Sequence, residues 1–192
     1  DGQIFKDTMR PAVSTALSVT RVGGVGQNKR QKSLADRLHL TLAGYRTAEE
    51  YAHFGTELSP QAQADYDKGK VLFKLMNQAI GEIYSYAEQQ FLMSIVLDSK
   101  PEEIIDVAAL KEKVHIYGPK LEEDKDLQGN FDELCASLKA EVTTIDVVKK
   151  AAIDKAAKAE EEKKRQAEEA AKALSDDDSK VLGISSDVKN ME

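Results

Sequence analysis

The chain has 192 residues, of which 41% are hydrophobic and 32% charged, and its formal net charge at pH 7 is -7. This length suits one folded domain with a tail, and the acidic balance argues against a nucleic-acid-binding protein, which normally presents a basic face. The longest apolar region, residues 79–97, is interrupted by glutamate and glutamine, so the sequence offers no candidate membrane span.

The first 27 residues are predicted to be extended and turn structure. Residues 3–5 have the composition of a strand, residues 13–19 alternate between apolar and small polar side chains, and the glycines after Arg21 permit a tight backbone path. Strands at a chain end need a sheet supplied by other polypeptide. Because the chain also begins with Asp rather than Met, we expect a fragment, either naturally split or trimmed from a longer subunit.

From residue 28 onward, apolar side chains recur every three or four positions, which predicts helices. The first helix carries its apolar stripe over residues 34–45. Ser59 followed by Pro60 is the start signal of the second helix. A third and more apolar helix is predicted over residues 80–97.

The second half of the chain is predicted to add two more helices. Helical spacing resumes at Ile104 and stops at Gly118-Pro119. Asn130, with Glu133 three residues later, resembles a capping box that opens the next helix. The helices are short, so they must be held by packing against one another.

The tail is predicted to be solvated. Residues 155–174 are nearly all Ala, Glu, Lys, Gln and Arg, which favours a protruding helix over a coiled coil that needs larger seam residues. A partner-binding helix is the alternative. The Ser- and Asp-rich end after residue 175 has the composition of a disordered segment.

Several residues are predicted to carry no chemistry. Cys135 falls in an apolar helical pattern and is expected to be a buried structural thiol. The three histidines have no Cys or carboxylate at metal-ligand spacing, so no metal site is predicted and each is expected on a surface or an interface. The acidic runs at residues 102–103 and 122–124 occur at a helix start and in a loop, where acidic residues are ordinary.

Two stretches of the sequence resemble the α subunit of F-type, proton-translocating ATP synthases. The first comprises residues 1–5, 10–13 and 17–24, followed by Gln27. The second comprises residues 42–46, 54–58 and 68–78. The first stretch is the more specific, and the similarity is clear to about residue 98, fainter to about 148 and absent from the tail.

The resemblance implies a fold class and domain bounds. We expect an α+β fragment, in which residues 1–27 are the end of an α/β nucleotide-binding domain that carries the arginine-finger strand and loop. Residues 28–148 would form a mainly α-helical C-terminal bundle. Residues 149–192 would form a charged helical extension and a disordered tail.

The resemblance also implies a catalytic role for Arg21. In the family, α and β subunits alternate around a rotating stalk, and α completes the catalytic nucleotide site of β. Arg21 matches the arginine that α inserts toward the phosphates, and Val19 matches a position that touches the same nucleotide. A guanidinium offers fixed, always-charged donors for the phosphoryl oxygens. Without the family, Arg21 would be read as a salt-bridged arginine at a strand end.

A second nucleotide site is implied on α itself, where nucleotide binds without being hydrolysed. Arg10, Pro11 and Gln78 match positions that line its adenine pocket. The sequence departs from the family at Ile80, where a second Gln is usual. The segment between Phe5 and Arg10 is also shorter than the family's. Both departures put nucleotide retention in question.

The expected cofactor is ATP or ADP with Mg²⁺, although the Mg²⁺ ligands and the phosphate-binding loop would lie upstream of residue 1. The expected partners are β subunits, the central-stalk γ subunit, the peripheral stalk and, if α is split, the remainder of α. The protein would serve an ATP synthase on the matrix face of the mitochondrial inner membrane, or on the cytoplasmic face of a bacterial plasma membrane, and would not be catalytic alone. The alternative is a structural α-like scaffold in a repurposed or split ATPase assembly, which the short loop, Ile80 and the long tail favour.

Overall fold

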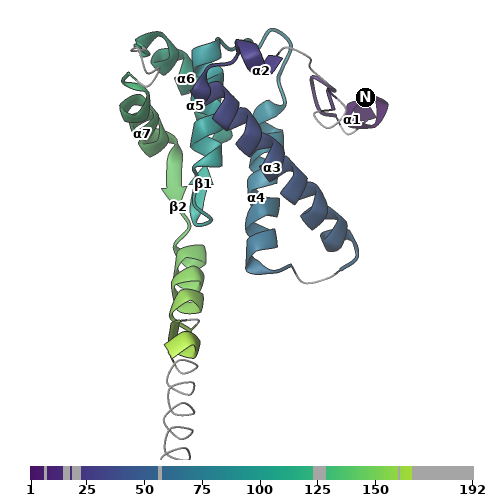
Figure 1. Ribbon diagram of the computed structural model, residues 1–192, viewed down its shortest axis with the longest axis vertical. Helices are drawn as coiled ribbons and strands as arrows, with labels where there is room; N and C mark the ends of the chain where they lie inside the picture. Colours follow the sequence, from purple (N-terminus) through teal and green to yellow (C-terminus); the bar gives the residue numbers. More distant parts are fainter. Residues whose placement is uncertain are drawn as a thin grey trace, which may run out of the picture. The chain divides into compact units, whose positions relative to one another are not determined.

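The structure is a computed structural model that describes residues 1–6, 8–14, 18, 23–55, 58–122, 129–159 and 161–165. The protein divides into two compact units, Asp1–Asp146 and Val147–Glu192. The first unit is mostly helical (Figure 1). Its elements in chain order are α1 (Gly2–Lys6), α2 (Gly23–Gly26), α3 (Lys29–His53), α4 (Pro60–Met76), α5 (Tyr86–Leu97), β1 (Glu103–Ile105), α6 (Val107–Tyr117), η1 (Gly118–Lys120), α7 (Phe131–Val142) and β2 (Thr143–Ile145).

The two long helices α3 and α4 begin where the sequence predicts. Asn28 caps α3, since its side chain accepts the backbone N–H of Gln31 while the Gln31 side chain accepts that of Asn28, as in a capping box. Ser59 caps α4 by accepting the backbone N–H of Ala62, and Pro60 occupies the first helical position. These starts confirm the predicted entry points of both helices.

Helix α5 forms the centre of the first unit, because it contacts α3, α4, α6 and α7. It lies among these helices in Figure 1. The Phe91 ring is fully buried and stacks on Phe131 of α7, with 4.7 Å between ring centroids. Burying a side chain of this kind stabilises the fold by about 1.5–3 kcal/mol, so α5 supplies much of the apolar core.

The predicted helix over residues 80–97 is wrong in its first third. Residues 77–85 form a loop, and α5 starts only at Tyr86. Gly81 has φ +84°, which a helix does not tolerate, and Ser85 with Glu88 makes a capping box that opens α5. The apolar side chains of Ile80 and Ile83 are therefore exposed rather than buried.

The predicted helical start at Ile104 is also wrong, because Ile104 lies in strand β1. This strand pairs antiparallel with β2 in the register Glu103↔Ile145, Ile104↔Thr144 and Ile105↔Thr143. Two flanking backbone bonds extend the ladder: the N–H of Asp106 donates to the Val142 oxygen, and that of Asp146 to the Glu102 oxygen. Helices α6 and α7 are thus enclosed between two paired strands.

Two further local predictions are wrong: the strand at residues 3–5 and the side-chain cap at Asn130. Residues 3–5 lie in helix α1 instead of a strand. The predicted strand at residues 13–19 lies largely outside the described residues and stays a prediction. Asn130 precedes α7 but does not cap it with its side chain. That side chain instead accepts the backbone N–H of Glu122 and donates to the backbone oxygen of Lys120, so it ties the start of α7 to the end of η1.

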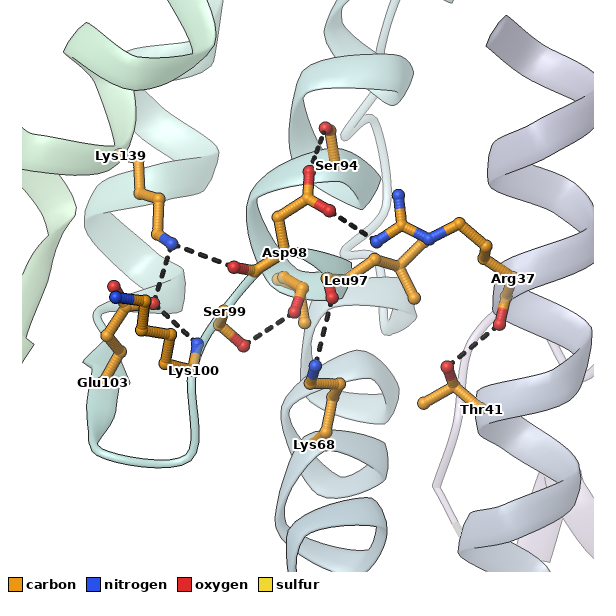
Figure 2. A network of polar contacts seen from close by, with 11 residues as sticks. Arg37, Thr41, Lys68, Ser94, Leu97, Asp98, Ser99, Lys100, Glu103 and Lys139 are labelled. Carbon is orange, nitrogen blue, oxygen red and sulfur yellow. Dashed lines mark hydrogen bonds and ion pairs between the residues drawn. The ribbon is translucent and has the colours of Figure 1, made fainter. Parts of the chain in front are cut away.

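Polar side chains from three helices converge on the C-terminal end of α5 (Figure 2). Arg37 of α3 pairs with the carboxylate of Asp98, and Lys139 of α7 donates to the Asp98 backbone oxygen at 3.0 Å. Lys68 of α4 donates to the backbone oxygen of Leu97 at 3.0 Å. Cations suit this position, because the last carbonyl groups of a helix lack intrahelical partners and carry partial negative charge. Burial, followed by repulsion from Arg37, lowers the pKa of Lys68.

Cys135 is half-buried and packs against the core from α7, less enclosed than expected. Burial raises the pKa of its thiol, which keeps it in the unreactive protonated form. In the second unit, residues 147–159 and 161–165 are helical with exposed side chains. None of the described helices combines the length and apolar character needed to cross a membrane.

Candidate functional site

The structure describes three of the five predicted site residues. Arg10, Pro11 and Gln78 are described, whereas Val19 and Arg21 lie outside the described residues. The roles predicted for Val19 and Arg21 therefore stay predictions. The site can be built only around the first three residues.

The backbone brings Arg10 and Gln78 together although they are far apart in sequence. The N–H of Gln78 donates to the backbone oxygen of Arg10 at 2.7 Å. One residue earlier, the Asn77 side-chain oxygen accepts the N–H of Arg10 at 2.8 Å. These two bonds fasten the N-terminal segment to the loop that follows α4, so the predicted adenine-pocket residues are neighbours in space.

The side chains of Arg10 and Gln78 differ in the hydrogen bonds that they make. The Arg10 guanidinium donates to the backbone oxygens of Phe5 and Met9 at 2.9 and 2.8 Å, and lies 3.6 Å from the centroid of the Phe5 ring. It thus folds the N-terminal segment onto itself. The Gln78 side-chain amide has no hydrogen-bond partner among the described residues, so it is available to a ligand.

The loop from residue 77 to 85 is held in place by Lys111 of α6. The Lys111 ammonium donates to the backbone oxygen of Asn77 at 2.6 Å and pairs with Glu82 at 2.9 Å. Glu82 in turn accepts the backbone N–H of Ala79 at 2.7 Å and the hydroxyl of Tyr84. These bonds hold the loop at both ends, from Asn77 to Tyr84.

Glu82 is ionised over an unusually wide pH range. Burial alone would favour its neutral form, but hydrogen bonds from Tyr84, Lys111 and the Ala79 backbone outweigh this and lower the pKa of Glu82 from 4.5 to about 2. The reverse applies to its partner, because burial and then the bond to Glu82 raise the pKa of Tyr84. The bonds that hold the loop to Lys111 and Tyr84 therefore depend on the negative charge of Glu82.

We expect the Glu82→Gln variant to lose stability that depends on pH. A depressed carboxyl pKa stabilises the fold above the unfolded value near 4.5, and this contribution disappears as the pH falls toward 2. Because the pair is partly solvated, the loss at neutral pH should be about 1 kcal/mol. Urea unfolding at a series of pH values measures it. The wild-type advantage should vanish near pH 2, and an advantage that does not change with pH would contradict the assignment.

Lys111, Glu82 and Tyr84 were not predicted as site residues. A lysine in a remote helix has no local pattern that links it to a loop about 30 residues earlier. The capping motif Ser85 to Glu88, together with Gly81, could have revealed that residues 77–85 are a loop. Ile80, the predicted departure from the family, lies on this loop and is fully exposed.

Two further ion pairs connect elements of the first unit. His115 contacts Glu88 at 2.8 Å and stacks on Tyr84 with 5.3 Å between centroids, so it braces the start of α5. Glu103 pairs with Lys139 at 2.7 Å. Across the described residues no three His, Cys, Asp or Glu side chains gather as they would around a metal ion.

Comparison with known proteins gives a consistent match. The family described as ATP synthase alpha/beta chain, C terminal domain, matches residues 27–183. Proteins named ATP synthase subunit alpha match shorter parts of the sequence. That of Anaplasma marginale (strain Florida) is 41% identical over 95 residues, which cover 46% of this chain and 19% of the relative.

Two further relatives carry the same name. That of Dictyoglomus thermophilum is 36% identical over 121 residues, covering 58% of this chain and 24% of the relative. That of Corynebacterium jeikeium is 37% identical over 108 residues, covering 53% and 19%. The alignments therefore cover about a fifth to a quarter of the length of these relatives.

Proposed function

Since this protein belongs to the family formed by the C-terminal domains of ATP synthase alpha and beta subunits, we propose that it is the C-terminal portion of the α subunit in the head of a proton-translocating ATP synthase. The observation that carries the proposal is the run of relatives named ATP synthase subunit alpha, at 36–41% identity. Within that head it would contribute to ATP synthesis and hydrolysis without being catalytic by itself.

The chemical contribution we assign to the protein is an arginine finger. Arg21 would reach from α into the catalytic site of a neighbouring β subunit. Phosphoryl transfer spreads negative charge over three oxygens, and a planar guanidinium can meet two of them at once. Delivery of this group from another subunit makes turnover depend on closure of the interface. Val19, two residues before, would contact the same nucleotide.

A second, non-hydrolysing nucleotide site would lie on α. Arg10, Pro11 and Gln78 would line its adenine pocket, and the pairing of the Arg10 and Gln78 backbones supports their belonging to one site. The Gln78 amide, without a partner among the described residues, suits the hydrogen-bonding edge of a base. Ile80 offers no such group, so we expect nucleotide to be held more weakly than in relatives with Gln at this position.

The proposed partners follow from the same assignment. They are β subunits, the γ subunit of the central stalk, the peripheral stalk and any separate polypeptide that completes α. ATP or ADP with Mg²⁺ would be the nucleotide, bound through a phosphate loop outside these 192 residues. The complex would be associated with a membrane. The relatives cited are bacterial, and a mitochondrial location stays a prediction.

A structural scaffold derived from α is the second candidate, and the exposed Ile80 favours it. An apolar residue on a fixed surface loop suits a protein contact more than a base edge. The two candidates differ in Arg21, because a scaffold has no use for a finger. Its replacement is therefore the decisive test and is argued in the Discussion.

Purification of the native assembly through a tag on this protein tests the assignment itself. We expect a β subunit, a γ subunit and, if α is split, a polypeptide with the phosphate-binding loop to be recovered together with ATP hydrolysis. Intact-mass spectrometry of the complex decides whether α is one polypeptide or two. Untagged cells serve as the control. Recovery of the tagged protein without any β subunit would contradict the proposal.

A further inference from the structure

A cavity of about 460 Å³ lies between the N-terminal segment and helices α3 and α4. This volume falls within the range typical of small-molecule sites, about 300–1,000 Å³. The residues that line it are Ile4 and Met9 of the N-terminal segment, Tyr45, Arg46 and Glu49 of α3, and Phe73, Lys74 and Asn77 at the end of α4. Met9 and Asn77 also belong to the junction with Arg10 described above.

The aromatic side of the cavity is fixed in position. Tyr45 is buried, and its ring centroid lies 5.0 Å from that of Phe73 at an interplanar angle of 55°. On its other side Tyr45 stacks on Tyr66, with 5.5 Å between centroids, and its hydroxyl donates to Glu49 at 2.6 Å. Tyr45 is therefore covered by its own neighbours, and the wall that the cavity offers to a flat apolar molecule is the partly exposed Phe73 ring, which Tyr45 holds in place without any ligand.

The polar side of the cavity carries more donors than acceptors. Within the described part of the protein, the Arg46 guanidinium and the Lys74 ammonium have no hydrogen-bond or ion-pair partner. The Asn77 side-chain oxygen is taken by the Arg10 N–H, which leaves its amide N–H groups to a ligand. Among the described residues of the lining, Glu49 is the one acid, and one of its oxygens accepts the Tyr45 hydroxyl.

From this arrangement we infer that the cavity binds a small molecule with a flat aromatic body and one anionic group, either a carboxylate or a phosphate. The body lies against the Phe73 ring that Tyr45 supports, and the anion accepts hydrogen bonds from Arg46, Lys74 and Asn77. The described lining residues carry two cations against one anion, and an anionic ligand neutralises this excess of positive charge. This inference is independent of the function proposed above, since it involves neither Arg21 nor Gln78.

The test is a calorimetric titration of the full 192-residue protein with three naphthalene probes of similar size. These are 1-naphthyl phosphate, 1-naphthoate and the neutral 1-naphthalenemethanol. We expect at least one anion to bind about tenfold more tightly than the neutral alcohol, because hydrogen bonds to charged groups exceed those to neutral groups. Binding of one anion and not the other supports the inference and identifies the anion class.

Single substitutions locate the site. Arg46→Gln and Lys74→Gln should each weaken anion binding about tenfold, whereas Lys32→Gln, an exposed residue of α3 outside the cavity, should leave it unchanged. Thermal melting of each variant checks that the fold is retained. Equal affinity for the alcohol and both anions would overturn the inference. Unchanged binding in a folded Arg46→Gln, Lys74→Gln double variant would overturn it as well.

Discussion

Replacing Arg21 with Ala in the assembled complex is expected to lower multisite ATP turnover by about 10³-fold or more, the range measured for arginine fingers in phosphoryl transfer. The reason is the loss of a fixed positive charge at the oxygens of the transferred phosphoryl group. Arg21→Lys should recover little of the activity, because an ammonium is a point charge that cannot meet two oxygens in one plane. The measurement is steady-state ATP hydrolysis with saturating Mg-ATP.

The matched control is Lys32→Ala, which removes a cation from an exposed position at the start of α3. Its turnover should equal that of the unmodified complex. Subunit composition must be verified for each variant, because a complex that fails to assemble would also lose turnover. If an assembled Arg21→Ala complex hydrolyses ATP at the wild-type rate, the arginine-finger role is wrong and the scaffold candidate is favoured.

The second large effect is expected where α3 crosses α4. A Cβ added at Gly69 would overlap both the ring and the Cβ of Tyr45, far inside the closest approach of two carbon atoms. Tyr45 is buried between Tyr66 and Phe73 and cannot move aside without breaking its stacking. We therefore expect Gly69→Ala to reduce the free energy of unfolding by about 2–3 kcal/mol, as overpacking does in other cores.

Gly44→Ala is the matched control for this substitution, since Gly44 is also an interior helical glycine near the same crossing. A Cβ at Gly44 would meet the side chain of Asp65, at 3.3 Å, and this side-chain end, which accepts a bond from the Gln61 amide at 3.2 Å, needs to give by only a few tenths of an ångström. Alanine also has the higher helix propensity, by up to about 1 kcal/mol. Urea unfolding should thus give opposite signs for the two variants. A neutral or stabilising Gly69→Ala would refute the close packing.

Local signals were sufficient wherever the cause of a helix start lies within a few residues. Asn28 and Ser59 cap their own helices, so the sequence alone identifies the entry points of α3 and α4. The loop at residues 77–85 was missed because its isoleucines repeat at helical spacing. Gly81, with its positive φ, and the N-cap at Ser85 prevent a helix over these residues, and neither signal is part of an apolar repeat.

Other features depend on partners far away in sequence. Ile104 joins a strand because Thr144 pairs with it from the far side of α6 and α7, and neither segment predicts the other. Lys111 likewise contacts the loop that contains Gln78 only because the fold brings α6 next to it, and no local pattern predicts this contact. Of the candidate site, the sequence named Arg10 and Gln78 through family resemblance, but their backbone pairing and the framework around them required the fold.

The pairing of β1 with β2 has an evolutionary consequence. Because Glu103 lies opposite Ile145, the polypeptide enters and leaves the α6–α7 hairpin at nearly the same point. Because its two ends are adjacent, the α6–α7 segment can be lengthened, shortened or exchanged without moving the residues before β1 or after β2. We therefore expect that a hairpin from a homologous subunit could replace this one at the two strands without changing the path of the flanking sequence.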